Sequence, residues 1–121
     1  MANILTVDDS PSIRQMIKVV LGPAGHTVFE AGDGAQGLEK AKSTKMDLVI
    51  TDLNMPVMNG LELIKALRAL PALTGLPIVF LTTESNDAIK QQAKAAGATG
   101  WITKPFQPAQ LLAVVGKLVR S

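Results

Sequence analysis

Residues 48–60 read LVITDLNMPVMNG, and this stretch predicts a buried strand that ends on a carboxylate. Its first four residues are apolar or β-branched without interruption, which is typical of a strand covered on both faces. The strand pattern stops at Asp52, and Pro56 and Gly60 then shape a loop before the next helical pattern. A carboxylate at this place is either a solvated turn residue or the rim of a site. The other strand ends distinguish between the two.

Short apolar segments alternate with longer amphipathic ones along the whole chain. The short segments are rich in Val, Ile and Thr, as strands are. They are Ile4 to Val7, Thr27 to Glu30, Leu48 to Thr51, Ile78 to Thr82 and Gly100 to Thr103. Helical spacing of apolar residues predicts a helix after each of them.

Three of the predicted helices have strong apolar stripes and two have weak ones. The strong stripes are Ile13, Met16, Ile17, Val20 and Leu21; Leu63, Ile64, Leu67 and Leu70; and Leu111, Leu112, Val115, Leu118 and Val119. The weak ones are Ala35, Leu38 and Ala41 after Asp33, and Ile89, Ala93 and Ala96 before Gly97. Small side chains on the weak stripes predict shallow packing.

Strands that alternate with helices predict an α/β fold. The continuously apolar central strands indicate a five-stranded parallel sheet with helices on both faces, a (βα)5 three-layer sandwich built from right-handed crossovers. The chain has 121 residues, so we expect one domain over residues 1–121, with no linker, repeat or second domain.

Composition argues against several functional classes. The chain has no Cys, so it offers neither a disulfide nor a thiolate metal site. Its formal net charge of +2 comes from scattered Lys and Arg, which does not favour nucleic-acid binding. Its apolar runs are too short for a membrane span, and its first ten residues do not resemble a signal peptide. We expect a cytoplasmic protein that inserts into no membrane.

The predicted strand ends carry chemically reactive groups. Parallel strands end at one edge of a sheet, where ligands bind in open α/β folds. The residues at this edge are Asp8, Asp9, Asp52, Thr82 and Lys104. Each alone has an ordinary explanation, because Asp caps helices, Thr is common in strands and Lys is usually exposed. Their joint placement predicts a site with three carboxylates, a hydroxyl and one ammonium.

Such an acidic cluster is expected to bind a cation. Three neighbouring carboxylates repel one another, and oxygen ligands favour Mg²⁺, with Mn²⁺ also possible, over zinc. His26, the single histidine, lies on a different strand, which we expect at an edge of the sheet. A cluster neutralised in this way can accept a phosphoryl group, with Asp52 as the nucleophile. The predicted metal ligands are Asp8, Asp9, Asp52 and the backbone carbonyl of Asn54.

Four segments, VDDS, TDLNMPVMNG, FLTTES and TKPF, occur in this order and resemble the bacterial response-regulator receiver domains. The chain is most similar to the CheY-like single-domain chemotaxis regulators within that family, and the resemblance covers essentially its whole length. It implies a flavodoxin-like fold with strand order 2-1-3-4-5 and a cis peptide bond before Pro105. By resemblance, Asp52 is the phosphoacceptor, Asp8 and Asp9 the acidic metal pair, Thr82 the switch hydroxyl and Lys104 the phosphate-contacting lysine.

A few positions depart from the family or refine the resemblance. Trp101 stands at the aromatic switch position, where Tyr or Phe is common; its other interpretation is a half-buried strand aromatic that covers an alanine-rich helix. Thr83 stands where many relatives have Ala or Gly, and it could narrow access to a phosphoryl group. Asn54 and Glu84 match the chemotaxis regulators, which implies quick autodephosphorylation.

The resemblance implies a stand-alone response regulator with no output domain. Its donor would be a histidine kinase, CheA-like if the pathway is chemotaxis, and its target a protein such as a flagellar switch protein. It would catalyse its own phosphorylation and dephosphorylation, act as a monomer and turn over no other substrate, so it is not expected to be an enzyme in the ordinary sense. The family's usual docking face here carries Lys90, Lys94, Trp101 and Lys117.

Other readings remain open at this point. One is a single-domain signalling receiver outside chemotaxis, and another is a receiver used only as an unphosphorylated binding module. A haloacid-dehalogenase-type phosphatase would need two aspartates two positions apart at the first strand end, whereas Asp8 and Asp9 are adjacent. A flavodoxin-like cofactor binder would need a first loop that accepts phosphate, which two aspartates would repel.

Overall fold

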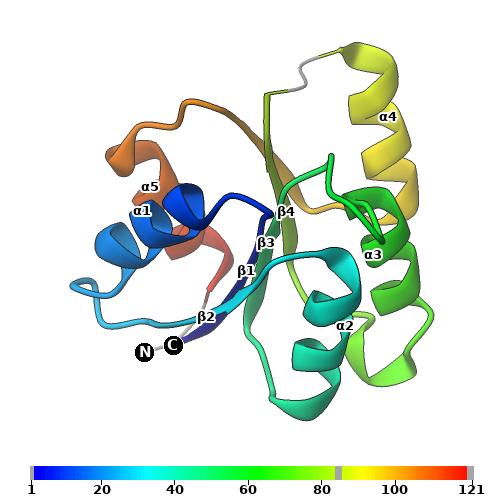
Figure 1. Ribbon diagram of the computed structural model, residues 1–121, viewed down its shortest axis with the longest axis horizontal. Helices are drawn as coiled ribbons and strands as arrows, with labels where there is room; N and C mark the ends of the chain where they lie inside the picture. The colour runs from blue at the N-terminus through cyan, green and yellow to red at the C-terminus, as the bar shows by residue number, and fades with distance from the viewer. Residues whose placement is uncertain (1, 84–85, 120–121) are drawn as a thin grey trace.

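Five parallel strands form one sheet in the order β2-β1-β3-β4-β5 (Figure 1). The computed structural model describes residues 2–83 and 86–119, so the expectation for Glu84 lies outside the described residues. The strands are β1 Asn3–Val7, β2 Thr27–Ala31, β3 Leu48–Thr51, β4 Ile78–Thr82 and β5 Gly100–Thr103. The predicted flavodoxin-like fold and its strand order are confirmed.

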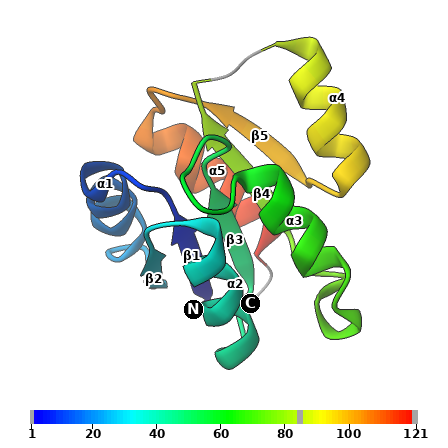
Figure 2. The same cartoon turned by 45° about the vertical axis from the view of Figure 1, so that its right-hand side comes forward.

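Helices cover both faces of the sheet. They are α1 Pro11–Leu21, α2 Gly34–Ser43, α3 Gly60–Arg68, α4 Asp87–Ala96 and α5 Pro108–Leu118, with a short 3-10 helix, η1, at Pro71–Leu73. Helices α1 and α5 lie on one face, and α2, α3 and α4 lie on the other (Figures 1 and 2). Within the described residues, no helix is long and apolar enough to cross a membrane.

Alternating residues of the central strands supply two separate cores. In β1, Ile4 packs into the core under α1 and α5, whereas Leu5 packs into the core under α2, α3 and α4. In β3, Val49 faces the second core while its neighbour Ile50 faces the first. Side chains in a strand point alternately to opposite faces, so a continuous apolar run is what a sheet covered on both sides requires.

The helix stripes differ from the sequence prediction at four residues. Met16 and Leu112 are 48% and 40% exposed, because Ile17 and Leu21 of α1, and Leu111 and Val115 of α5, fill the narrow line of contact with the sheet. Leu70 lies beyond α3, which ends at Arg68, and Val119 lies beyond α5, which ends at Leu118. The backbone of Leu70 is extended, as expected for a residue before proline.

The ends of the elements follow from local chemistry. Strands β1 and β2 are each one residue longer than predicted. Ser10 caps α1, and its side chain accepts from the backbone N–H of Ile13 at 3.4 Å. Helix α4 ends at Gly97, as predicted, in a left-handed conformation with φ 110°. His26 directly precedes β2, which is an edge strand, so it lies at the other end of the sheet from the predicted site.

Candidate functional site

The sheet itself places the predicted site residues at one edge. The backbone N–H of Asp8 donates to Ala31 at 3.1 Å, and that of Asp52 donates to Val7 at 2.8 Å. In the same way, the backbone N–H of Lys104 donates to Thr82 at 2.8 Å. The ladder of hydrogen bonds therefore continues one residue past each strand, and it fixes the backbone from which these side chains extend.

Three carboxylates converge at this edge. One oxygen from each of Asp8, Asp9 and Asp52 lies within 4.8 Å of the other two. Asp8 is 2% exposed and Asp52 is 9% exposed, whereas Asp9 is exposed to solvent. The cluster thus has two buried members and opens to solvent on the side of Asp9.

Lys104 joins the two buried carboxylates. Its Nζ lies 2.8 Å from Oδ2 of Asp8 and 3.3 Å from Oδ2 of Asp52. The other oxygen of each carboxylate accepts from the backbone: Oδ1 of Asp8 from Ser10 N–H at 2.9 Å, and Oδ1 of Asp52 from Leu53 N–H at 2.7 Å. Each buried carboxylate is therefore held at both oxygens, and its orientation is fixed before any ligand arrives.

Burial and the ion pair between Asp8 and Lys104 together set the pKa values of these two residues. Burial raises the pKa of Asp8, and hydrogen bonds from Lys104 and Ser10 only partly oppose the rise. Burial alone would lower the pKa of Lys104, but its hydrogen bond to Asp8 and its attraction to both carboxylates together raise it. Lys104 therefore remains a cation at neutral pH.

The remaining predicted residues lie around this cluster. Thr82 is fully buried at the end of β4, and Thr83 and Asn54 are exposed. Gly60 is required at its position, because a Cβ there would collide with the carbonyl oxygen of Asp52 and lie 2.6 Å from the Phe80 ring. The peptide bond between Lys104 and Pro105 is cis, as the resemblance implied.

The donor set fits a hard divalent cation. The converging atoms are carboxylate oxygens, and two of the three carboxylates are held in fixed orientations. Mg²⁺ prefers oxygen ligands and is commonly bound through one or two carboxylates together with waters. Asp8, Asp9 and Asp52 are therefore suited to hold Mg²⁺, while the contribution of the Asn54 carbonyl stays a prediction.

Trp101 lies away from the acids, beside α4. Its ring centroid is 5.6 Å from that of Phe80, and Nζ of Lys90 lies 5.9 Å from the ring centroid. Trp101 is half-buried and packs against the core that contains Ala93, which is the placement expected of a strand aromatic covering an alanine-rich helix. Its role as a switch stays a prediction.

A groove of about 290 Å³ runs between α4 and β5. Its lining consists of Lys90, Ala93, Lys94, Ala98, Thr99, Gly100 and Trp101. The structure thus brings together three of the four residues predicted for the docking face. Lys117, in the last turn of α5, is exposed but does not line this groove.

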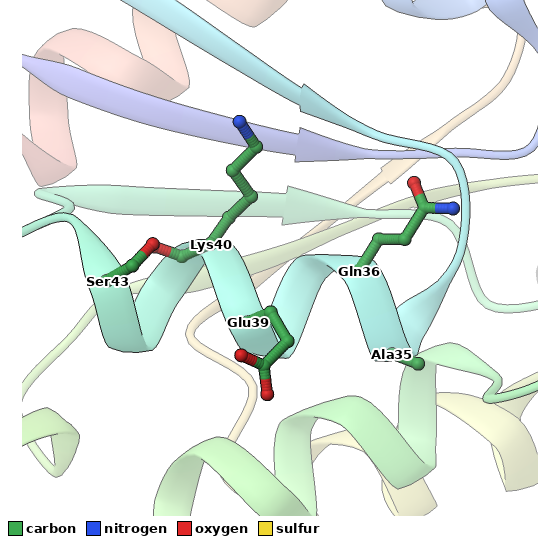
Figure 3. Close-up of a pocket in the computed structure, with 5 residues that line it drawn as sticks. All are labelled: Ala35, Gln36, Glu39, Lys40 and Ser43. Carbon is green, nitrogen blue, oxygen red and sulfur yellow. The ribbon is translucent and has the colours of Figure 1, made fainter.

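A larger hollow than this groove lies elsewhere, over the outer face of α2. It has a volume of about 520 Å³ and is lined by Ala35, Gln36, Glu39, Lys40 and Ser43 (Figure 3). Figure 3 shows that Glu39 and Lys40 point in different directions, so they do not form a converging pair. This surface offers no set of reactive groups comparable to the acidic cluster.

Sequence reasoning missed a residue that supports the site from α1. Arg14 donates through Nη1 to the backbone carbonyl of Asp8 and through Nε to Glu30 at 3.1 Å. It therefore ties the end of β1 to the edge strand β2. The periodicity of α1 places Arg14 off the apolar stripe, but it gives no signal for this contact.

Comparison with known proteins identifies the family. The sequence profile of the response regulator receiver domain matches residues 4–116. The chain belongs to this family. Receiver domains take phosphoryl groups from histidine kinases in two-component signalling.

Individual relatives extend the comparison. The DNA-binding response regulator MtrA of Mycolicibacterium smegmatis is 38% identical over 117 residues, which are 97% of this chain and 50% of that protein. The chain spans about half the length of the curated relatives that it matches. The chemotaxis protein CheY4 of Vibrio cholerae is 47% identical with a TM-score of 0.94, and the match covers 98% of this chain and 99% of that one.

A further neighbour concerns the metal. The receiver domain of sensor histidine kinase PA1611 from Pseudomonas aeruginosa is 27% identical with a TM-score of 0.91, over 99% of this chain and 98% of that one. That structure has a magnesium ion coordinated in its active-site cleft.

Proposed function

We propose that this receiver accepts a phosphoryl group on Asp52 from a phosphohistidine of a histidine kinase, with Mg²⁺ held by Asp8, Asp9, Asp52 and the Asn54 carbonyl. The observation that carries the proposal is the convergence of three carboxylates with the ammonium of Lys104. No other cluster among the described residues combines a buried carboxylate, a potential metal site and a cation.

The reaction is a transfer between two nucleophiles. A carboxylate oxygen of Asp52 forms a bond to phosphorus while the phosphorus–nitrogen bond of the donor breaks, and the electron pair leaves on the imidazole nitrogen. Bound Mg²⁺ would supply positive charge to the phosphoryl oxygens. Lys104 is already within 3.3 Å of Oδ2 of Asp52, and its raised pKa keeps it charged, so it can pair with a phosphoryl oxygen.

The same site would also remove the group. Attack of water on phosphorus breaks the new bond between oxygen and phosphorus and returns the Asp52 carboxylate and inorganic phosphate. Asp9 and Asn54 are exposed beside the buried acids, so water has access from this side. The chain would thus catalyse its own phosphorylation and dephosphorylation without turning over another substrate.

Phosphorylation would change the surface through Thr82 and Trp101. A phosphoryl group adds acceptor oxygens, and the hydroxyl of Thr82, which ends the strand next to that of Asp52, would donate to one of them. A movement of Thr82 toward the phosphoryl group would change the packing of α4 and of the Trp101 ring beside it. A full reversal of a two-state equilibrium from 1:99 to 99:1 needs about 5.5 kcal/mol of differential interaction.

Among receiver pathways, we favour chemotaxis, with a CheA-like kinase as donor and a flagellar switch protein as target. The chain is 47% identical to Vibrio cholerae CheY4 and 38% identical to MtrA. The groove with Lys90, Lys94 and Trp101 suits an acidic or amphipathic segment of a partner. The alternative is a signalling receiver outside chemotaxis, for which the likeness to the DNA-binding regulator MtrA argues.

The decisive experiment is incubation with acetyl phosphate and Mg²⁺, followed by intact mass spectrometry. Wild type should gain one labile phosphoryl group, and Asp52→Asn or wild type in EDTA should gain none. Asp87→Asn, which changes an exposed aspartate of α4, should react like wild type. Undiminished modification of Asp52→Asn would refute the assignment. Transfer from a purified chemotaxis kinase, compared with other histidine kinases, would then distinguish the two pathway classes.

A further inference from the structure

The loop that follows Asp52 contains a strained turn. The backbone N–H of Met58 donates to the carbonyl of Pro56 at 2.7 Å, which closes a three-residue turn around Val57. Val57 has φ 69°, and its side chain is 82% exposed. A β-branched residue with positive φ is a rare and strained arrangement, and turns of this kind are uncommon. Strain of this sort persists only where neighbouring structure enforces it.

The first residue of α2 supplies that enforcement. The backbone N–H of Gly34 donates to the carbonyl of Met58 at 3.1 Å. The approach is so close that a Cβ on Gly34 would collide with this carbonyl oxygen and lie 2.8 Å from Cβ of Met58. Gly34 therefore lies directly against the turn, and its lack of a side chain is a requirement of the contact.

Helix α2 cannot easily retreat from this contact. Gly37, one turn further along, is buried against Val7, and a Cβ on Gly37 would lie 2.8 Å from Cγ2 of Val7. Val7 is the residue before Asp8, so the position of α2 is set by the same strand that positions the acid. Asp33 fixes the helix start by accepting from the backbone N–H of Gln36 at 2.8 Å.

The loop is also fixed at its two ends. At its start, the backbone N–H of Leu53 donates to Oδ1 of Asp52, and the carbonyl of Leu53 accepts from Gly60 N–H at 2.8 Å. At its end, Asn59 and Glu62 form a reciprocal cap on α3. Between these ends, the Gly34–Met58 hydrogen bond ties the loop to the start of α2, and the Met55 and Met58 side chains pack against the core.

We infer that the contact between Gly34 and Met58 holds the strained Val57 turn, and that it thereby sets the affinity of the acidic cluster for Mg²⁺. Gly34 and Val57 are positioning residues, since neither touches the carboxylates. The inference rests on the proposed function, because it assigns a purpose to the loop of the same site. If the loop spends part of its time in another conformation, the apparent affinity for Mg²⁺ falls in proportion to the fraction of molecules that keep the binding conformation.

The test compares Gly34→Ala, Val57→Gly and the double variant with wild type. Mg²⁺ alone is titrated at a temperature well below unfolding, and the amide resonances of Asp52 and Leu53 report binding. Thermal unfolding in EDTA reports stability separately. Gly32→Ala is the matched control, because its Cβ would meet only the ends of the Gln36 and Arg14 side chains, at 3.5 and 3.8 Å.

Gly34→Ala should weaken Mg²⁺ binding about tenfold and lower the unfolding temperature, since the added methyl group would push the loop away. Val57→Gly should raise the unfolding temperature by a few degrees, because Gly adopts positive φ without strain, yet weaken Mg²⁺ binding about threefold. A purely structural role would not raise stability and lower affinity together. In the double variant, the unstrained turn should absorb the displacement, so the effect of Gly34→Ala on affinity should shrink to less than about threefold.

The inference is overturned if Val57→Gly and folded Gly34→Ala both bind Mg²⁺ within about twofold of wild type, or if their effects on affinity simply add. If Gly34→Ala does not fold, the inference is overturned when Val57→Gly alone binds Mg²⁺ within about twofold of wild type. A wild type that binds no Mg²⁺ and gains no phosphoryl group would instead overturn the proposed function along with the inference. A wild type that does both, beside a Val57→Gly and a folded Gly34→Ala that both bind Mg²⁺ as wild type does, would overturn the inference alone.

Discussion

Lys104 and Asp8 form an ion pair across the sheet, with Nζ of Lys104 2.8 Å from Oδ2 of Asp8. They follow β5 and β1, which are separated in the sheet by β4 and β3 (Figure 2). The same ammonium lies 3.3 Å from Asp52. One cation therefore compensates two buried acids on separate strands, and we expect stability and reactivity both to depend on it.

Replacing Lys104 by Met should destabilise the fold by about 1–3 kcal/mol at pH 7, because two carboxylates lose their shared cation. The raised pKa means that folding favours the protonated amine. The stabilisation is thus fully present below pH 10.5, the ordinary pKa of Lys, and is lost as pH rises through the higher pKa of the folded state. Urea unfolding at pH 7 and pH 11 measures the difference. The control is Lys65→Met, on the exposed side of α3, whose free energy of unfolding should stay within about 0.5 kcal/mol of wild type. An equally small effect for Lys104→Met would contradict the stabilising role of the ion pairs that Lys104 makes.

Asp8→Asn should make the protein more stable in EDTA at neutral pH. Because burial raises the pKa of Asp8, the folded state binds its proton more tightly than the unfolded state does. Wild type therefore loses stability as pH rises above 3.8, the ordinary Asp value, and the advantage of the amide should vanish below that pH. Added Mg²⁺ should stabilise wild type but not the variant. Thermal unfolding with and without Mg²⁺ tests this, and a variant less stable than wild type in EDTA at pH 7 would show that burial is not the controlling factor.

Arg68 at the end of α3 should be a major contributor to the position of α4. Its Nε and Nη2 donate to the carbonyl of Gly97 at 3.2 and 2.8 Å, and its Nη1 donates to Leu73 at 3.0 Å and to Thr74 at 3.2 Å. Arg68→Met leaves these carbonyls without their donor, so we expect a loss of about 2–3 kcal/mol in urea unfolding, with hydrogen exchange increased in α4. An unchanged exchange rate in α4 would mean that the helix is held by other contacts.

Two glycines should respond to alanine with opposite signs. At Gly97, φ is 110° and a Cβ would lie 2.8 Å from Nε of Arg68, so Gly97→Ala should destabilise by more than about 1 kcal/mol. At Gly116, in the exposed interior of α5, a Cβ would meet nothing within 4 Å, so Gly116→Ala should stabilise by about 0.5–1 kcal/mol. Urea unfolding of both variants checks the signs, and a shared sign would contradict the conformational argument.

The fold could be predicted from the sequence because the periodicities of strands and helices are local properties. The acids could be grouped without a structure because the parallel arrangement sends Asp8, Asp52 and Lys104 to one edge. The prediction that Met16 and Leu112 are buried was wrong for a different reason. Whether a residue at the margin of a stripe is buried depends on how a helix rolls on the sheet, and this is set by long-range packing.

The contacts that support the site were beyond sequence reasoning for the same reason. The hydrogen bond from Gly34 to Met58 and those from Arg68 to Gly97 join residues 24 or more positions apart. A glycine before a helix or an arginine at its end is ordinary in any sequence. Only the packing of α2 and α4 against the neighbouring loops shows which partner each one meets.

Trp101, the single Trp of the chain, should report activation by fluorescence. Its ring lies beside Phe80 and within 5.9 Å of Lys90, so a rearrangement of α4 would change its surroundings. Mg²⁺ with beryllium fluoride, a phosphoryl mimic, should shift the emission of wild type and leave that of Asp52→Asn unchanged. Thr82→Ala should keep phosphorylation, measured by intact mass, but lose most of the emission shift, because on the proposed mechanism the hydroxyl transmits the change to Trp101. If wild type becomes phosphorylated without any emission shift, Trp101 is a packing residue of β5 and the switch must act through another part of the surface.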